Sequence, residues 1–298
     1  MSYKILVFVK QVPDTQNISG DAMKPDGTVN RAALPAIFNP EDLNALELAL
    51  QLKDKYGAKV VAGTMGPPNA AEVLREAMYR GADEAVLLSD RAFAGADTLA
   101  TSYALSCCAN KIGKYDLILC GRQAIDGDTA QVGPQLAEKL ALPQISYVEE
   151  ILELSKNKVK ARREIEGGYE VVEAPLPALM TVIDANEPRP AAARRLMKYK
   201  KARTPFELSR DHANANYTDA EALAVEQENL KSRGLLITEY SASEVGADIQ
   251  RTGLNGSPTK VKKIQNVVLK ATDSKMIEAN EAGITELIHE LIADHTLG

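Results

Sequence analysis

The stretch CGRQAIDGDTAQVGP, residues 120–134, has the residue types that could bind a phosphate group. It directly follows the apolar run Leu117–Leu119, which is typical of a buried strand. Gly127 and Gly133 would let a phosphate approach the backbone, and the Thr129 hydroxyl could donate a hydrogen bond to it. A turn with an ordinary helix cap would use the same residue types. The stretch alone therefore leaves both interpretations open.

Other chemistries find little support in the sequence. The chain has three cysteines and three histidines, namely Cys107, Cys108, Cys120, His212, His289 and His295. The cysteines have no CxxC spacing, which argues against a disulfide framework, a zinc site or an iron–sulfur cluster. The histidines lack partners at ligand spacing, so a catalytic triad or a metal hydrolase is not expected. Any redox chemistry must come from a bound cofactor.

Composition and charge exclude further classes of protein. The formal net charge is −6, so we expect no nucleic-acid partner. The chain has no run of about 18 apolar residues that would predict a membrane span. Its first residues lack the charged and apolar regions of a signal peptide. We therefore expect a cytoplasmic protein without a membrane span.

The elements that would position the 120–134 stretch alternate between strands and helices. Short apolar runs lie at Ile5–Val9, Val60–Ala62, Ala85–Leu88 and Leu117–Leu119, and each is followed by a loop and a helical pattern. This alternation predicts an α/β fold with a doubly wound, mostly parallel sheet, similar to a Rossmann fold. In such sheets ligands bind at the carboxyl ends of the strands.

Two helices are predicted to begin near the carboxyl ends of these strands. The fourth run should lead into a helix over Thr129–Leu140, capped by Asp128 or Thr129. Asn39 and Pro40 should begin an earlier helix, with the asparagine as its cap and the proline in its first turn. The sequence contains neither GxxxxGK[ST] nor a well-placed GxGxxG, so the usual phosphate and dinucleotide motifs are missing.

The pattern changes after Pro143. Four closely spaced strand-like segments, at 145–154, 158–165, 169–174 and 178–183, predict an antiparallel extension at the edge of the sheet. A basic, proline-containing stretch, a polar helix near 218–233 and an irregular C-terminal arm follow. We therefore divide the chain into a nucleotide-binding α/β domain over 1–200 and a C-terminal extension over 201–298.

The final helix carries an apolar stripe that should be buried against another surface. The stripe consists of Ile284, Leu287, Ile288, Leu291 and Ile292. Its spacing matches one face of a helix.

A longer motif then points to a known family. ARREIEGGYEVVEAPLPALMT, residues 161–181, resembles the signature of electron transfer flavoprotein beta subunits, with its elements in the family's order. FVKQVPDT, NPEDLNALELALQLK, TMGPP and GRQAIDGDTAQVGP are similar to further family segments in the expected order. The resemblance covers essentially the whole chain.

The resemblance implies an adenine-nucleotide site and an alpha-subunit partner. The implied cofactor-binding residues are Phe8, Val9, Asn39, Pro40, Met65, Gly66, Arg122, Asp126, Gly127, Asp128, Thr129, Ala130, Gln131, Val132 and Gly133. The amides at the helix start and Thr129 would hold phosphates, while Asn39 and the first strand would border the adenosine. No side chain is expected to act as a catalytic acid or base.

The family offers two nucleotides for this site. Housekeeping members hold AMP as a structural ligand, whereas electron-bifurcating members hold FAD. The segment DGDTAQVGP looks like the bifurcating form and implies FAD. Hydride would come from NADH, one electron would leave to ferredoxin or flavodoxin, and the other would pass through the alpha-subunit FAD to a dehydrogenase. A non-bifurcating AMP-holding carrier is the alternative, and a universal-stress-type nucleotide module explains fewer of the motifs.

The resemblance also implies a docking loop for the dehydrogenase, of the acyl-CoA or lactate type. The loop reads NEPRPAAARRLMKYKK, and Ala193 stands where the family has an apolar anchor, typically leucine. Arg194, Arg195 and Leu196 are therefore candidate docking residues, and a stable complex with the dehydrogenase is the alternative to such docking. The segment 205–250 is longer than expected for the family, which suggests that the C-terminal extension packs on the alpha subunit or on the dehydrogenase.

Overall fold

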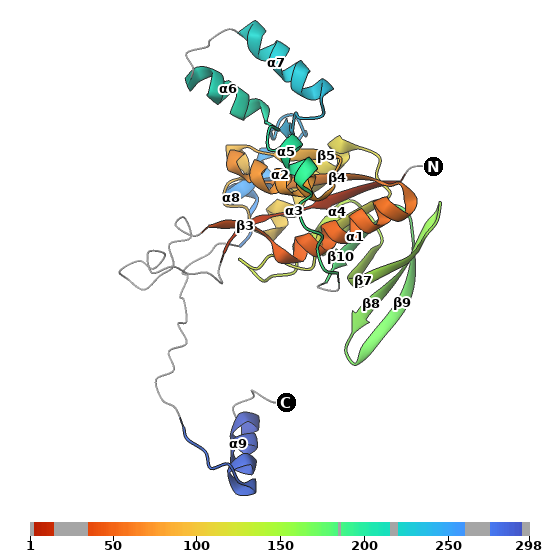
Figure 1. The fold of residues 1–298 in the computed structure, drawn as a ribbon, viewed down its shortest axis with the longest axis vertical. Coiled ribbons are helices and arrows are strands. Elements are labelled where there is room, and N and C mark those ends of the chain that lie inside the picture. The colour runs from red at the N-terminus through yellow and green to blue at the C-terminus, as the bar shows by residue number, and fades with distance from the viewer. Residues whose placement is uncertain (1–2, 15–34, 184–185, 215–219, 260–274, 294–298) are drawn as a thin grey trace.

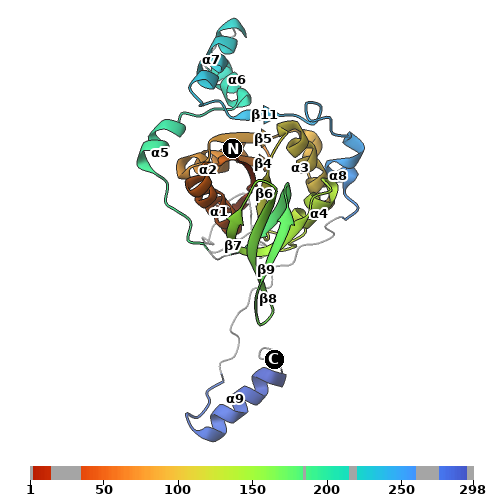
Figure 2. The same cartoon turned by 90° about the vertical axis from the view of Figure 1, so that its right-hand side faces the viewer.

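A nine-stranded, mostly parallel sheet forms the centre of the molecule (Figures 1 and 2). The computed structural model describes residues 3–14, 35–183, 186–214, 220–259 and 275–293. Strands follow the order β11-β5-β4-β1-β6-β10-β7-β8-β9 across the sheet. Their bounds are β1 Lys4–Phe8, β4 Lys59–Met65, β5 Glu84–Leu88, β6 Leu117–Gly121, β7 Gln144–Leu154, β8 Lys158–Ile165, β9 Gly168–Pro175, β10 Ala178–Val182 and β11 Thr238–Tyr240. The predicted α/β fold is confirmed.

Helices cover both faces of the sheet. Figure 2 shows α1 (Pro40–Tyr56), α2 (Ala71–Arg80) and α5 (Ala193–Tyr199) on one side of the strands. The other side carries α3 (Thr98–Ile112), α4 (Val132–Lys139) and α8 (Gly253–Gly256). Two apolar clusters follow from this arrangement, one on each face. Burial from both sides explains why β1 and β6 are continuous apolar runs rather than alternating ones.

The antiparallel extension is present but contains one strand fewer than predicted. β7, β8 and β9 pair antiparallel at the sheet edge. The segment 178–183 was expected to belong with them, and this prediction is wrong: β10 lies between β6 and β7 and is parallel to both. Its residues are all buried, as its apolar run without alternation requires. The short distance along the chain between β9 and β10 suggested a hairpin. However, β10 is apolar on both faces, so it is buried in the interior of the sheet.

The C-terminal segments differ in how they lie relative to the sheet. α6 (Pro205–Asn214) and α7 (Ala220–Ser232) project beyond it in both views, and β11 adds to β5 in parallel. The 3-10 turn η5 (Ile249–Arg251) and α8 then lie near α3. α9 (Glu281–Ala293) stands apart from the sheet in both figures. None of the described helices is long and apolar enough to cross a membrane.

A small second sheet precedes α1. It pairs β2 (Gln11–Pro13) antiparallel with β3 (Ala36–Phe38). Residues 15–34, between the two strands, lie outside the described part of the chain.

Candidate functional site

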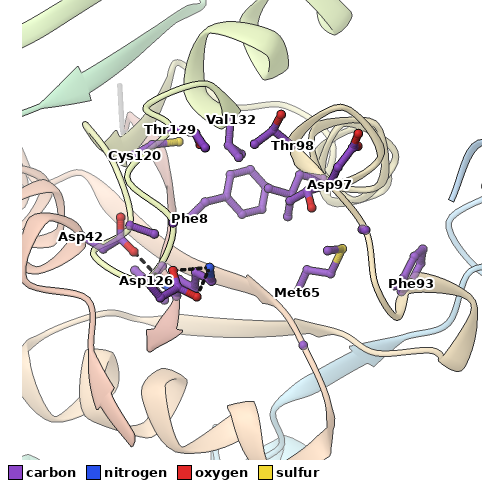
Figure 3. Close-up of a pocket in the computed structure, with 18 of the residues that line it drawn as sticks. Phe8, Asp42, Met65, Phe93, Asp97, Thr98, Cys120, Asp126, Thr129 and Val132 are labelled. Atoms are coloured by element: carbon purple, nitrogen blue, oxygen red, sulfur yellow. Dashed lines mark hydrogen bonds and ion pairs between the residues drawn. The ribbon is translucent and has the colours of Figure 1, made fainter. Parts of the chain in front are cut away.

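A cavity of about 1030 Å³ lies at the carboxyl ends of the central parallel strands. Figure 3 shows Phe8 near its centre, with Met65 and Phe93 on one side and Cys120, Thr129 and Val132 on the other. Most of the expected cofactor residues line it: Phe8, Val9, Met65, Gly66, Arg122, Asp126, Gly127, Asp128, Thr129, Ala130, Gln131, Val132 and Gly133. The structure thus brings together loops from β1, β4 and β6 at one edge of the sheet.

Asn39 and Pro40, which the resemblance also implies as cofactor-binding residues, do not line the cavity. Asn39 is fully buried and makes no side-chain cap bond at α1, contrary to the expectation. Its Nδ2 donates to the Gln123 carbonyl oxygen at 2.8 Å, and its Oδ1 accepts from the Ile125 amide at 3.2 Å. Pro40 at the first helical position leaves no amide there to cap, so the Asn39 side chain holds the β6–α4 loop (residues 122–131) instead.

The β6–α4 loop ends in a helix start without a side-chain cap. The expected helix over Thr129–Leu140 is wrong at its beginning, since α4 begins at Val132. Asp128 and Ala130 have φ values of 48° and 51°, which interrupt any helical run through them. Gln131, at the N-cap, makes no side-chain cap bond. Amide groups at such a start favour an anion, so the loop fits a phosphate.

Gly133 allows this helix start to approach the sheet. A Cβ atom at this position would lie 2.5 Å from Cγ2 of Thr181 on β10. A Cβ atom at Gly127 would meet nothing within 4 Å. The two glycines therefore differ: Gly133 is required by packing, whereas Gly127 lies in open space beside the cavity.

Asp42 is a cavity residue that the sequence analysis missed. Its Oδ1 accepts from the Gly121 amide at 3.0 Å and its Oδ2 from the Lys10 amide at 2.8 Å. Burial raises the pKa of this carboxyl group to about 7, although the hydrogen bonds from Asn39, Gly121 and Lys10 act in the opposite direction. The sequence does show an acidic residue in the first turn of this helix. Such residues are common there because they interact favourably with the helix dipole, so Asp42 did not indicate a site.

Two cations at the cavity are held by acidic partners. Lys10 Nζ lies 2.7 and 2.9 Å from the two carboxylate oxygens of Asp126. Arg122 donates from Nε and Nη2 to Glu41 at 3.2 and 2.7 Å, and this hydrogen bonding raises the pKa of the guanidinium. A guanidinium has five N–H donors, so Arg122 keeps donors beyond those used by Glu41. Each of these two cations at the cavity is thus paired with a carboxylate.

A fourth loop, residues 89–98, completes the wall. This loop follows the third apolar run, and none of its residues was expected to bind the cofactor. Asp97 caps α3 by accepting from the Ala100 amide at 3.0 Å, and Thr98 donates to Gln131 Oε1 at 2.8 Å. The starts of α3 and α4 are therefore joined at the cavity. Phe93 adds an aromatic ring to the lining (Figure 3).

The candidate docking residues lie on α5, away from the cavity lining. Ala193, Arg194 and Leu196 are exposed. Arg195 is half-buried and donates to the carbonyl oxygens of Met78 at 2.7 Å and Ala82 at 2.5 Å, so its guanidinium binds the end of α2 within the chain. Within the described ranges no group of three or more histidine, cysteine, aspartate or glutamate side chains could hold a metal ion.

The fold and the cavity define an open-sheet α/β protein with a site at its carboxyl edge. Residues 26–205 match the "Electron transfer flavoprotein domain" family. The chain is 41% identical over 292 residues to the electron transfer flavoprotein subunit beta of Clostridium acetobutylicum, covering 98% of both chains. The chain belongs to the electron transfer flavoprotein beta-subunit family.

Two further relatives carry names that refer to larger assemblies. The chain is 44% identical over 260 residues to the caffeyl-CoA reductase-Etf complex subunit CarD of Acetobacterium woodii, covering 87% of this chain and 86% of that one. It is 40% identical over 306 residues to the acryloyl-CoA reductase electron transfer subunit gamma of Anaerotignum propionicum, covering 99% and 100%.

Proposed function

We propose that the cavity holds FAD and that the chain is the NADH-oxidising beta subunit of an electron-bifurcating flavoprotein. The observation that carries the proposal is the size of the cavity, about 1030 Å³. Ligand pockets commonly range from about 300 to 1,000 Å³, so this cavity stands at the upper end and suits a dinucleotide better than a mononucleotide. The segment DGDTAQVGP, which resembles the bifurcating form of the family, also supports FAD as the ligand.

The side chains have distinct tasks in this proposal. The amides at the start of α4 and the Thr129 hydroxyl bind phosphate, and Lys10 and Arg122 supply positive charge beside it. Phe8 and Met65 provide apolar contact for the adenosine. Bound there, FAD would supply hydride acceptance from NADH and electron delivery to ferredoxin or flavodoxin and, through an alpha-subunit FAD, to a dehydrogenase.

The relatives' names support the proposed partners. Two of the relatives are named as parts of CoA-ester reductase systems. These names favour an acyl-CoA-type dehydrogenase over a lactate-type enzyme as the partner, beside the alpha subunit. We propose that the exposed Arg194 and Leu196 on α5 contact the dehydrogenase, with Ala193 at the anchor position. Arg195 contributes indirectly, because it fixes α5 on α2.

The alternative is a carrier that holds AMP as a structural ligand. One observation favours it: the part of the site that fits phosphate comprises a single helix start, which is sufficient for one phosphate group. The experiment is to purify the chain with its alpha subunit, denature the complex and quantify the released nucleotides by chromatography. We expect two FAD per heterodimer. One FAD with one AMP would refute the bifurcating function and establish the alternative.

A further inference from the structure

A strained residue lies next to an arginine of the cavity lining. Tyr147 on β7 has a φ of 60°, a left-handed value that is uncommon for a residue with a bulky side chain. Such strain persists only where the surroundings fix the conformation, and it is concentrated at functional sites. Tyr147 does not line the cavity, but its ring lies near the guanidinium of Arg122, which does.

A β-bulge gives Tyr147 this conformation. The register between β7 and β10 shifts between Met180 and Val182, so that Ser146 and Tyr147 stand opposite Thr181 alone. The Tyr147 amide donates to Thr181 Oγ1 at 3.3 Å. The extra residue interrupts the two-residue alternation of side chains along β7, so it decides which way the Tyr147 ring points. Bulges that redirect a side chain in this way are common next to active sites.

Residues of the 161–181 motif hold the bulge in place. Arg163 donates from Nε to the Ser146 carbonyl oxygen at 2.8 Å and from Nη2 to Ser146 Oγ at 3.2 Å. Its Nη1 donates to Glu170 at 2.6 Å, which restricts the same guanidinium. None of the residues 161–181 lines the cavity. The motif therefore acts on the site through the position of the bulge.

The ring of Tyr147 and the carboxylate of Glu41 both restrict Arg122. The ring centroid lies 6.0 Å from Arg122 Cζ, within reach of a cation–π contact. Glu41 accepts from Nε and Nη2 of the guanidinium at 3.2 and 2.7 Å. Among the residues that the structure describes, none accepts a hydrogen bond from Nη1. The guanidinium is thus oriented from two sides and keeps a donor group for a ligand.

We infer that Tyr147 is a positioning residue for the nucleotide site: its ring holds Arg122 so that the Nη1 donors meet a phosphate oxygen of the ligand. The inference rests on the proposed nucleotide chemistry of the cavity. An arginine recognises phosphate through donors fixed in one plane, so its orientation decides how many of them the phosphate can use. The positive φ is retained because the ring must have this orientation.

The test compares ADP with adenosine, which lacks phosphate. Both compete with the nucleotide already bound to the complex of the full chain with its alpha subunit. Tyr147→Gly should weaken ADP binding roughly three- to fivefold, the scale of one exposed cation–π contact, and leave adenosine binding unchanged. Tyr147→Phe keeps the ring and should bind ADP like the unaltered complex. Ala141→Gly is the matched control, because Ala141 has a similar φ of 51° but does not line the cavity.

Arg122→Ala separates positioning from direct contact. If Tyr147 acts through Arg122, adding Tyr147→Gly to Arg122→Ala should cause no further loss of ADP affinity. Additive losses would overturn the inference, because Tyr147 would then act without Arg122.

Three other results would also overturn the inference. They are an equal loss of ADP and adenosine affinity in Tyr147→Gly, which marks a merely structural role, unchanged ADP affinity in that variant, and a loss in Tyr147→Phe. The proposed function fails separately. Finding AMP instead of FAD after denaturation refutes bifurcation alone, because AMP also carries a phosphate for Arg122. An unaltered complex that binds ADP no more tightly than adenosine refutes the phosphate contact of Arg122, whatever its flavin content.

Discussion

At the scale of single residues, the carboxyl group of Asp42 is the least ordinary feature of the cavity wall. It joins the carboxyl ends of β1 and β6 to the first turn of α1 through the amides of Lys10 and Gly121. A Cβ atom at Gly121 would lie 2.6 Å from Asp42 Oδ1, so the glycine is what permits this approach. The two central strands and the helix are therefore positioned by one buried acidic group.

Asp42 should make stability depend on pH. Burial raises its pKa from 3.8 to about 7, so between these values the folded chain binds a proton that the unfolded chain has released. The free energy of unfolding should then fall as pH rises from about 4 to 7, by at most about 1.4 kcal/mol per pH unit, and level off above. Asp42→Asn should lose this slope. Denaturant titrations at pH 5, 6, 7 and 8 measure it, and an unchanged slope in the variant would contradict the assignment.

Gly133 tests the close approach of α4 to β10. Gly133→Ala places a methyl group 2.5 Å from Thr181 Cγ2, which should cost roughly 1–3 kcal/mol of unfolding free energy as overpacking. It should also lower the amount of bound nucleotide, because the helix start moves. Gly168→Ala is the control, since Gly168 does not line the cavity and its Cβ would meet nothing within 4 Å, so neither quantity should change. Equal nucleotide content in the two variants would show that the position of α4 is not critical.

At the scale of elements, the sequence predicted the strands that are continuous apolar runs. It did not predict boundaries that depend on backbone dihedral angles. β1, β4, β5 and β6 were predictable because their apolar runs are continuous. The start of α4 was not, because the positive φ angles of Asp128 and Ala130 have no distinct pattern in the sequence. Asp42 escaped notice for a related reason: its burial depends on contacts with Gly121 and Lys10, which lie far from it in the chain.

The short helix α8 supports the 89–98 loop of the cavity. The Leu254 amide donates to the Ala94 carbonyl oxygen at 3.1 Å, and Thr259 donates to Asp97 from its hydroxyl at 2.7 Å. Gly253 has a φ of 53°, and a Cβ atom there would lie 2.8 Å from the same Ala94 oxygen and also overlap the Ala92 carbonyl. The C-terminal arm is thus fitted closely to one wall of the site.

Gly253→Ala should detach this support. The clash with the two carbonyl oxygens should raise hydrogen exchange over residues 90–98, measured by mass spectrometry. Gly246→Ala is a matched control, because Gly246 has a similar φ of 65° but nothing lies within 4 Å of its Cβ position. Both variants carry the strain of a positive φ, about 1 kcal/mol, so only the clash separates them. Equal exchange in the two variants would refute the supporting role of α8.

At the scale of the whole molecule, the prediction of two domains divided at residue 200 remains a prediction. β11 follows that boundary yet pairs with β5, and Phe206 follows it yet lines the cavity. The pairing of β11 with β5 could not be predicted from the sequence, because β11 is only three residues long. The basic stretch and the polar helix near 218–233, which α7 confirms, were readable from composition and period.

The apolar stripe of α9 is exposed to solvent in this chain. It was expected to be buried, but Ile284, Leu287, Ile288 and Ile292 are 55, 39, 44 and 53% exposed. An amphipathic helix gains its stability mostly from packing of its apolar face. Because the described part of this chain leaves that face exposed, we expect the alpha subunit to cover it.

Ile288→Glu should therefore weaken the complex with the alpha subunit. Placing a carboxylate in the middle of a buried apolar face removes apolar contact and buries a charge, so the dissociation constant should rise at least roughly tenfold. Ala293→Glu adds the same charge on the opposite face of α9 and should leave affinity within about twofold of the original, as surface substitutions usually do. Analytical ultracentrifugation of the co-purified subunits measures both. Equal affinities would mean that the exposed stripe faces something other than the alpha subunit, and that the α/β body alone holds the two chains together.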